Sequence, residues 1–81
     1  MAYEVRLFAL LRERVGTERW AYEADGVVTG SALLAAFFDA HPDLDGLRNV
    51  TRLAVNQSFC DADLELKPGD ELALIPPVSG G

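Results

Sequence analysis

The chain ends in the letters IPPVSGG, and the group in this stretch that could do chemistry is the α-carboxylate of Gly81. A carboxylate is a poor electrophile until one of its oxygens becomes a leaving group, which ATP achieves by forming an acyl-adenylate. Sulfide or an amine could then attack the acyl carbon. The neighbouring Gly80 adds no side chain, so another protein could hold the tip closely. The terminal carboxylate is therefore our candidate reactive group, with a frayed chain end as the alternative.

Two prolines precede this tip and should shape it. Pro76 and Pro77 cannot donate to a β-ladder, so we expect the last strand to end near Ile75. Prolines also favour a stiff, extended backbone, and the chain beyond Ile75 can span at most roughly 20 Å. We therefore expect a domain over residues 1–75 and an extended tail over residues 76–81 that can enter a narrow channel in another protein.

The other potentially reactive side chains give weaker signals. Cys60 is the single cysteine, so it forms no internal disulfide, and no Cys or His spacing resembles a zinc site. We expect no bound metal and regard Cys60 as a small, partly buried thiol. His41 precedes Pro42, where a helix should end, which favours a capping role over a catalytic one.

The charge and length of the chain exclude several classes of partner. Thirteen acidic residues against seven Lys and Arg give a formal net charge of −6 over 81 residues. Because phosphate binding needs clustered cations, we expect no nucleic-acid and no membrane partner, and a basic cleft on another protein as the electrostatic complement. The apolar stretches are too short to cross a bilayer, and the N-terminus lacks a signal-peptide cleavage site. These features predict a single cytoplasmic domain.

Hydrophobic periodicity predicts the elements that must position the tail. Alternating apolar residues predict strands at 3–9, 17–24 and 51–56, a short return strand near 59–60 and a last strand ending near Ile75. The residues expected to point inward are Tyr3, Val5, Leu7, Ala9, Trp20, Tyr22, Ala24, Leu53, Val55, Leu72 and Leu74.

Between the second and third strands the apolar spacing becomes helical. The pattern predicts a helix that is capped by Thr29 or Ser31 and stopped by Pro42, followed by a loop over residues 43–49. Pro68 and Gly69 fit a type II turn before the last strand. One helix packed on one face of a mixed sheet indicates an α+β fold of the ubiquitin-like β-grasp type, with the first and last strands parallel neighbours.

The same alternation leaves apolar residues on the sheet face opposite the core. Phe8 and Ile75 fall on that face, and Phe59 follows a turn that can bring it near them. Exposed aromatics on neighbouring strands favour a binding patch, whereas a miscounted pleat would make Phe8 a core residue. The residues expected to bind a partner are Phe8, Phe59, Ile75, Pro76, Pro77 and Val78.

Three stretches resemble those of the small subunits of molybdopterin synthase, sulfur-carrier proteins of the ubiquitin-like superfamily. They are VRLFALLRERVG near the start, LAVNQSF in the middle and LKPGDELALIPPVSGG at the end. Their order and spacing cover nearly the whole chain, and the tail PPVSGG is the most discriminating piece. The predicted helix and the stretch DLDGLRN are generic and add little.

The resemblance implies a reaction cycle in which Gly81 carries sulfur. A ubiquitin-activating-like adenylyltransferase would use ATP and Mg to adenylate Gly81, and a sulfur donor would convert it to a thiocarboxylate. The carrier would bind no cofactor itself. Its tail would then enter the catalytic pocket of the large subunit of a heterotetrameric synthase and donate sulfur to a phosphorylated pterin precursor. Gly80 would be the slender neighbour of the reactive group.

Three alternative functions remain at this point. A sulfur carrier for the thiazole of thiamin also ends in Gly-Gly. A protein modifier would use the same adenylate to join its terminus to lysines, although Lys67 is the single lysine of this chain, which disfavours self-conjugation. A non-catalytic interaction domain would not need its terminus.

Overall fold

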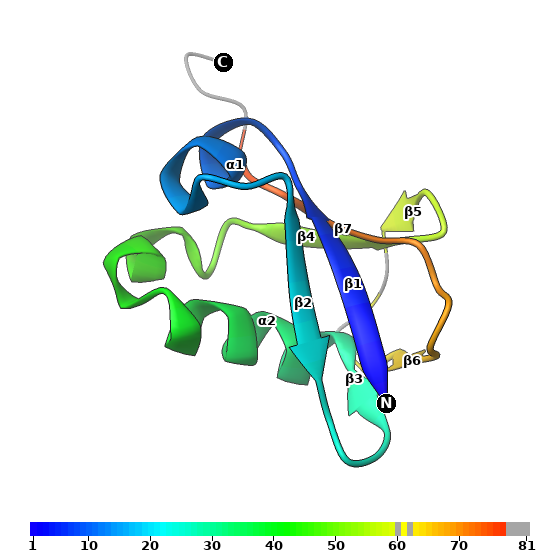
Figure 1. Ribbon diagram of the computed structural model, residues 1–81. Coiled ribbons are helices and arrows are strands. Elements are labelled where there is room, and N and C mark those ends of the chain that lie inside the picture. The colour runs from blue at the N-terminus through cyan, green and yellow to red at the C-terminus, as the bar shows by residue number, and fades with distance from the viewer. Residues whose placement is uncertain (60, 62, 78–81) are drawn as a thin grey trace.

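The computed structural model describes residues 1–59, 61 and 63–77, and its main element is a mixed sheet with one long helix on one face (Figure 1). Val78, Gly80, Gly81 and Cys60 therefore lie outside the described residues. The strands are β1 (Ala2–Leu7), β2 (Arg19–Glu23), β3 (Val28–Thr29), β4 (Arg52–Val55), β5 (Ser58–Phe59), β6 (Glu65–Leu66) and β7 (Leu72–Ile75). The helices are α1 (Ala9–Val15), α2 (Gly30–Ala40) and the 3₁₀ helix η1 (Pro42–Leu47).

The strand order of the main sheet is β2-β1-β7-β4-β5. β1 runs antiparallel to β2 and parallel to β7, with Val5 opposite both Trp20 and Leu72. β4 then runs antiparallel to β7, and it pairs with β5 in a hairpin. The predicted β-grasp arrangement, with the first and last strands as parallel neighbours, is confirmed.

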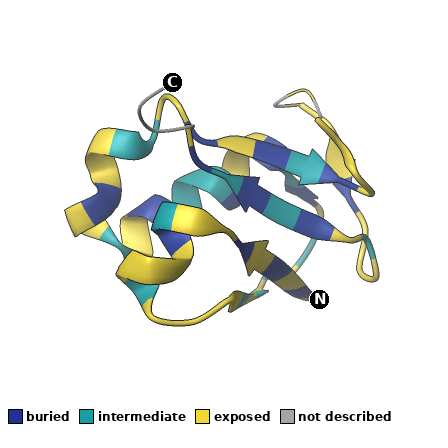
Figure 2. Cartoon of the chain, turned by 90° about the horizontal axis from the view of Figure 1, so that it is seen from above, coloured by how far each residue is buried: buried dark blue, intermediate teal, exposed yellow. Residues whose placement is uncertain are grey.

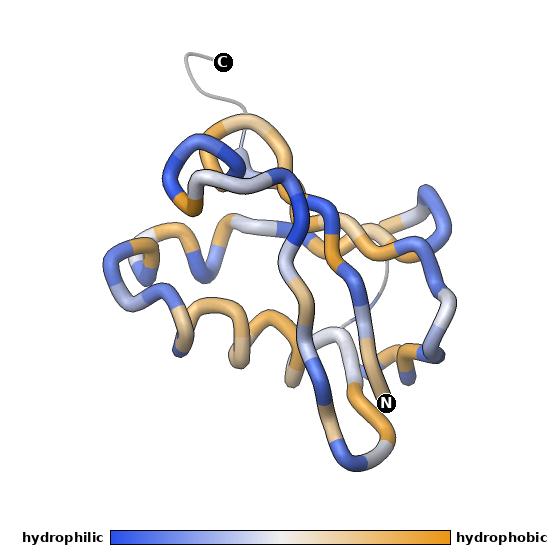
Figure 3. The backbone as a smooth tube through the Cα atoms, viewed as in Figure 1, coloured by the Kyte–Doolittle hydropathy of each residue, from blue (hydrophilic) through white to orange (hydrophobic). Residues whose placement is uncertain are grey.

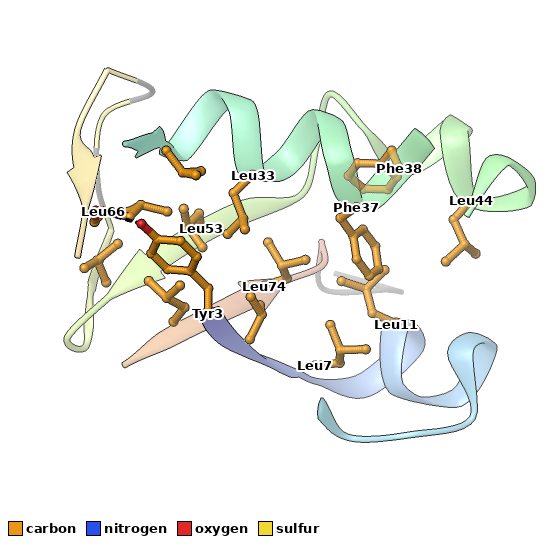
Figure 4. Packing of buried hydrophobic residues seen from close by; sticks show 14 residues of the cluster. Tyr3, Leu7, Leu11, Leu33, Phe37, Phe38, Leu44, Leu53, Leu66 and Leu74 are labelled. Atoms are coloured by element: carbon orange, nitrogen blue, oxygen red, sulfur yellow. Dashed lines mark hydrogen bonds between the residues drawn. The ribbon is translucent and has the colours of Figure 1, made fainter. Parts of the chain in front are cut away.

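The core lies between α2 and the inner face of this sheet (Figure 4). Along β1, β4 and β7 buried residues alternate with more exposed ones, so these strands contribute every second side chain to the core (Figure 2). The buried apolar residues are Tyr3, Val5, Leu7, Leu11, Val28, Leu33, Phe37, Phe38, Leu44, Leu53, Val55, Leu66, Leu72 and Leu74. Complete burial of such side chains stabilises the fold by about 1.5–3 kcal/mol each relative to exposure.

Helix α2 is mostly apolar along its length (Figure 3) and has defined ends. The Thr29 hydroxyl accepts a hydrogen bond from the amide of Ala32 at 3.2 Å, which satisfies one of the free N–H groups of the first turn. At the other end, His41 is the C-cap residue, and its Nδ1 lies 2.8 Å from the carbonyl oxygen of Phe37. The expected positions of Thr29 and His41 at the helix ends are confirmed.

The segment expected to be a loop, residues 43–49, is largely helical. The 3₁₀ helix η1 covers Pro42–Leu47 and buries Leu44. Arg48, just after it, donates to Asp45 at 2.9 Å and to Asp39 at 3.0 Å. Its hydrogen bonds to Asp39 and Asp45 raise the pKa of the Arg48 guanidinium. Two leucines, Leu44 and Leu47, inside a short polar stretch are too few for periodicity to indicate a helix.

The first strand is shorter than expected, and the prediction that Ala9 points into the core is wrong. β1 ends at Leu7, and Ala9 is the exposed first residue of α1 with a φ of 48°. Phe8 is the extended N-cap, and its carbonyl accepts from the amides of Leu11 and Arg12. Leu11, which is fully buried, packs into the core in place of Ala9.

A second, two-stranded sheet of β3 and β6 was not predicted. Val28 pairs with Leu66 and Thr29 with Glu65. Both strands have two residues, which is below the length at which alternation can be recognised. This pair connects the segment that contains β6 to the start of α2. The amide of Gly30, the first residue of α2, also donates to the carbonyl of Leu64 at 3.0 Å.

The longest described helix, α2, has 11 residues. Within residues 1–59, 61 and 63–77, no helix has the length and apolar character needed to cross a membrane. The same residues contain no group of three His, Cys, Asp or Glu side chains placed to hold a metal ion.

Candidate functional site

The outer face of the main sheet, opposite α2, carries the candidate site. One row of neighbouring positions crosses four strands, and it runs through Arg6, Ala73, Ala54 and Phe59. These residues alternate with core residues and therefore project from the uncovered side of the sheet. Because the side chains of Ala54 and Ala73 are small, the surface is lower in the middle of the row than at Arg6 and Phe59.

The structure brings together three of the residues that were predicted to bind a partner. Phe8, Phe59 and Ile75 line one shallow hollow of about 300 Å³. The side chains of Phe8 and Phe59 are 36% and 53% exposed, and Ile75 is half-buried. The alternative in which Phe8 is a core residue is therefore wrong. The other residues that line the hollow are Ala54, Gln57, Glu71 and Ala73.

Each exposed phenylalanine has an arginine over its ring, a feature that sequence reasoning missed. The guanidinium carbon of Arg6 lies 5.4 Å from the ring centre of Phe8, and that of Arg52 lies 3.8 Å from the ring centre of Phe59. Such cation–π contacts contribute about 0.5–1 kcal/mol each at exposed sites. Alternation could have placed Arg6 beside Phe8, since the two are separated by one residue, but Arg52 and Phe59 meet only through the β4–β5 hairpin.

A tight turn fixes the position of Phe59. Asn56 and Gln57 have φ values of 51° and 71°, as the two central residues of a type I′ hairpin turn require. The Asn56 amide group donates to the carboxylate of Asp70 at 3.2 Å and accepts from the backbone amide of Glu71 at 2.9 Å. These bonds tie the β4–β5 turn to the start of β7, and they fix the hairpin that places Phe59 two strands away from β7, with β4 between them.

The tail begins at the same end of the sheet as Phe8. Leu7 pairs with Leu74 in the parallel ladder, so Phe8 and Ile75 both follow directly at this end. Pro77 is exposed, but Pro76 is buried in the fold. The burial of Pro76 does not favour contact with a partner, but its binding role and the domain boundary at Ile75 both stay predictions. The predicted roles of Val78, Gly80 and Gly81 concern residues outside those described.

No side chain from residue 72 to the end of the sequence can take up or release a proton near neutral pH. That stretch, LALIPPVSGG, contains apolar residues, prolines, glycines and one serine. A reaction at the terminal carboxylate would therefore need its general acid, general base and phosphate-binding cations from another protein.

Comparisons with known proteins agree with this geometry. The model of the ThiS family matches residues 5–81. The molybdopterin synthase sulfur carrier subunit of Chlamydomonas reinhardtii is 43% identical over 84 residues, with all of both chains covered. Among solved structures, small archaeal modifier protein 1 (SAMP1) from Haloferax volcanii superimposes with a TM-score of 0.82 at 36% identity, again over the whole of both chains.

A further solved structure contains two proteins. It is the complex of subunits 1 and 2 of the molybdopterin-converting factor from Helicobacter pylori. The matching chain of that complex has a TM-score of 0.68 and 29% identity, and the match covers all of that chain and all of this one. The fold predicted from the sequence and the family resemblance are thus confirmed. The chain belongs to the ThiS family, together with the molybdopterin synthase sulfur carrier subunits.

Proposed function

We propose that this protein is the sulfur carrier subunit of molybdopterin synthase and that Gly81 carries the sulfur. The observation that carries the proposal is the end-to-end match to a molybdopterin synthase sulfur carrier subunit, together with a family match that extends through Gly81. A sulfur carrier for thiamin's thiazole is not favoured, because the curated relatives are sulfur carriers of molybdopterin synthase.

The proposed chemistry takes place at one carbon atom. An oxygen of the Gly81 carboxylate attacks the α-phosphorus of ATP on an activating enzyme that resembles ubiquitin-activating adenylyltransferases, and magnesium pyrophosphate leaves. A sulfide equivalent then attacks the acyl carbon, and AMP departs with the former carboxylate oxygen. The product is a thiocarboxylate, whose sulfur is the nucleophile delivered to the pterin precursor.

The large subunit of molybdopterin synthase is the proposed partner for that delivery. The two-protein structure from Helicobacter pylori contains a chain of this fold together with subunit 2 of its converting factor. The hollow lined by Phe8, Phe59 and Ile75 adjoins the start of the tail, so a protein seated there could receive the tail in its own pocket. Because residues 72–81 lack titratable side chains, we assign the catalytic pocket to the large subunit.

A second function, protein modification, is favoured by one specific observation. SAMP1, a small archaeal modifier protein by name, is 36% identical over the whole chain. The same acyl-adenylate would serve both functions, because a lysine amine can attack it where sulfide otherwise does. The two functions differ only in the nucleophile and therefore do not exclude each other.

Intact mass spectrometry of the protein from its native cells separates these possibilities. A sulfur carrier shows the replacement of one oxygen by sulfur, localised to Gly81 by fragmentation. A modifier appears as a branched peptide in which the C-terminus is joined to a lysine of another protein. A terminus that stays a free carboxylate even after incubation with the activating enzyme, ATP and a sulfur donor would contradict the proposal.

Addition of one alanine after Gly81 tests whether the terminus is the working group. The extra residue moves the carboxylate by up to about 3.5 Å and adds a methyl group, so we expect ATP–pyrophosphate exchange by the activating enzyme to fail. Circular dichroism and binding to the large subunit should be unchanged, because the main sheet is untouched. Normal exchange by the extended chain, with trimming excluded by mass spectrometry, would contradict the assignment of Gly81.

A further inference from the structure

The two arginines on the outer sheet face differ from the other arginines whose contacts are described. Arg19 pairs with Glu4 at 3.2 Å, and Arg48, which also lies 5.7 Å from the ring centre of Phe38, pairs with both Asp39 and Asp45. Within residues 1–59, 61 and 63–77, Arg6 and Arg52 have no carboxylate within 4.0 Å and lie over phenylalanine rings instead. Their charge is therefore available for a ligand from outside this part of the chain.

Stacking prepares a guanidinium for such a ligand. At 3.8 Å from the centre of the Phe59 ring, the Arg52 guanidinium is in van der Waals contact with the aromatic face. The contact occupies one face of the planar group and restricts its motion, while the N–H bonds around the rim can still point away from the protein. This rim is the part that binds a carboxylate with two parallel hydrogen bonds.

The two arginines stand on opposite sides of the hollow. Arg6 is opposite Ala73 on one side of β7, and Arg52 is opposite Ile75 on the other side. Two strand spacings and an offset of two residues place their Cα atoms roughly 12 Å apart. Other charged groups on this face include Glu71, which lines the hollow, Glu23 on β2, and the ion pair of Arg19 with Glu4 beside Arg6. Arg6 also lines a second hollow with Glu4, Asp70 and Glu71.

We propose that this face recognises an acidic segment of the large synthase subunit, in which two carboxylates bind Arg6 and Arg52 and an apolar side chain between them fills the hollow. The proposal rests on the proposed function, since it concerns the docking step of that partner. The proposal also differs from the prediction, made from the net charge, that the partner presents a basic cleft. A net charge of −6 favours a basic partner in general, whereas this one face requires acidic residues.

The arrangement gives docking a defined orientation. The pterin precursor is anionic, so its pocket in the large subunit must contain cations, and the tail that enters it contributes no charged side chain. Acidic groups placed away from that pocket, opposite Arg6 and Arg52, would allow one orientation of the carrier and disfavour the reversed one. Complementary charges act in this way on specificity and association rate more than on affinity.

Charge reversal at the two arginines, with a matched control, tests the proposal. We would titrate the purified large subunit from the same organism with Arg6→Glu, Arg52→Glu and Lys67→Glu chains, each of which makes the net charge more negative by the same amount. Lys67 lies in the turn between β6 and β7, at the far end of β7 from Ile75. We expect roughly a tenfold loss of affinity for Arg52→Glu, a smaller loss for Arg6→Glu because its stack is looser, and less than about a twofold change for Lys67→Glu.

The milder Arg6→Gln and Arg52→Gln variants guard against misfolding, with circular dichroism as the check. They should weaken binding by a few-fold and reduce its dependence on salt. Equal losses in all three charge-reversed chains, or binding by both arginine variants as tight as that of the unmodified chain, would overturn the inference while leaving the sulfur-carrier function intact. If the unmodified chain itself does not bind the large subunit, the proposed function and the inference both fail.

Discussion

The two faces of the main sheet are made by the same strands, but the rest of the chain covers the inner face and leaves the outer face exposed. On the inner face, Val5, Leu7, Leu72 and Leu74 are at most 1% exposed and belong to the hydrophobic core. On the outer face, Phe59 is 53% exposed, and no helix of the described residues covers it. The inner face therefore supplies stability, and the outer face keeps apolar surface available for a partner. Substitutions on the two faces should separate folding from binding.

The largest expected effect is in the core between the inner face and α2, to which α2 contributes Phe37. Phe37 is fully buried and makes edge-to-face contacts with Trp20 and Phe38, each at 5.1 Å between ring centres. Phe37→Ala leaves a cavity that such a small domain cannot refill, so we expect the free energy of unfolding to fall by about 3–5 kcal/mol. Urea denaturation followed by circular dichroism measures this loss.

The same substitution on the outer face is the matched comparison. Phe59→Ala removes an exposed ring and its contact with Arg52, so we expect a loss of stability of only about 1 kcal/mol. If Phe59→Ala and Phe37→Ala destabilise the fold equally, the division of labour between the two faces is incorrect.

A charge placed in the hollow should affect binding more than folding. Phe8→Asp puts a carboxylate in the lining of the hollow on the proposed docking face, and we expect affinity for the large subunit to fall by about 2 kcal/mol, which is roughly thirtyfold in Kd. The backbone carbonyl of Phe8, which starts α1, is retained. Calorimetric titration and thermal unfolding of the same samples separate the two quantities. A large drop in melting temperature with unchanged affinity per folded molecule would count against the docking role.

Alternation predicted both faces of the sheet because it is a property of each strand by itself. Leu53, Val55, Leu72 and Leu74 point inward as expected, and Phe8 points outward. The features that the sequence did not predict depend on contacts between segments that are distant in the chain. Arg52 reaches Phe59 through the hairpin, and the β3–β6 pair joins two-residue strands far apart in the chain.

The start of the tail shows a further limit of local reasoning. Proline chemistry predicted the end of β7 at Ile75, and the structure agrees. It could not reveal that Pro76 is still buried, because burial depends on which segments pack around the end of the strand. The reactive role of Gly81 remains a prediction based on carboxylate chemistry and on family membership.

The smallest expected effect concerns the residue after Phe59. Cys60→Ser should leave sulfur transfer unchanged, because the carried sulfur belongs to the terminal acyl group and not to a side-chain thiol. The assay is conversion of the pterin precursor by the thiocarboxylated variant with the large subunit. Loss of conversion in a variant that still folds and binds would show that the Cys60 thiol itself takes part in the transfer.

A single-turnover reaction tests the central claim most directly. The chain is prepared with a thiocarboxylate at Gly81 and mixed with the large subunit and the pterin precursor, and both product and carrier are analysed by mass spectrometry. We predict that each carrier returns to the carboxylate form as one sulfur atom enters the pterin, and that the unsulfurated chain yields no product. A carrier that keeps its sulfur while product forms, or equal product from the unsulfurated chain, would contradict the account.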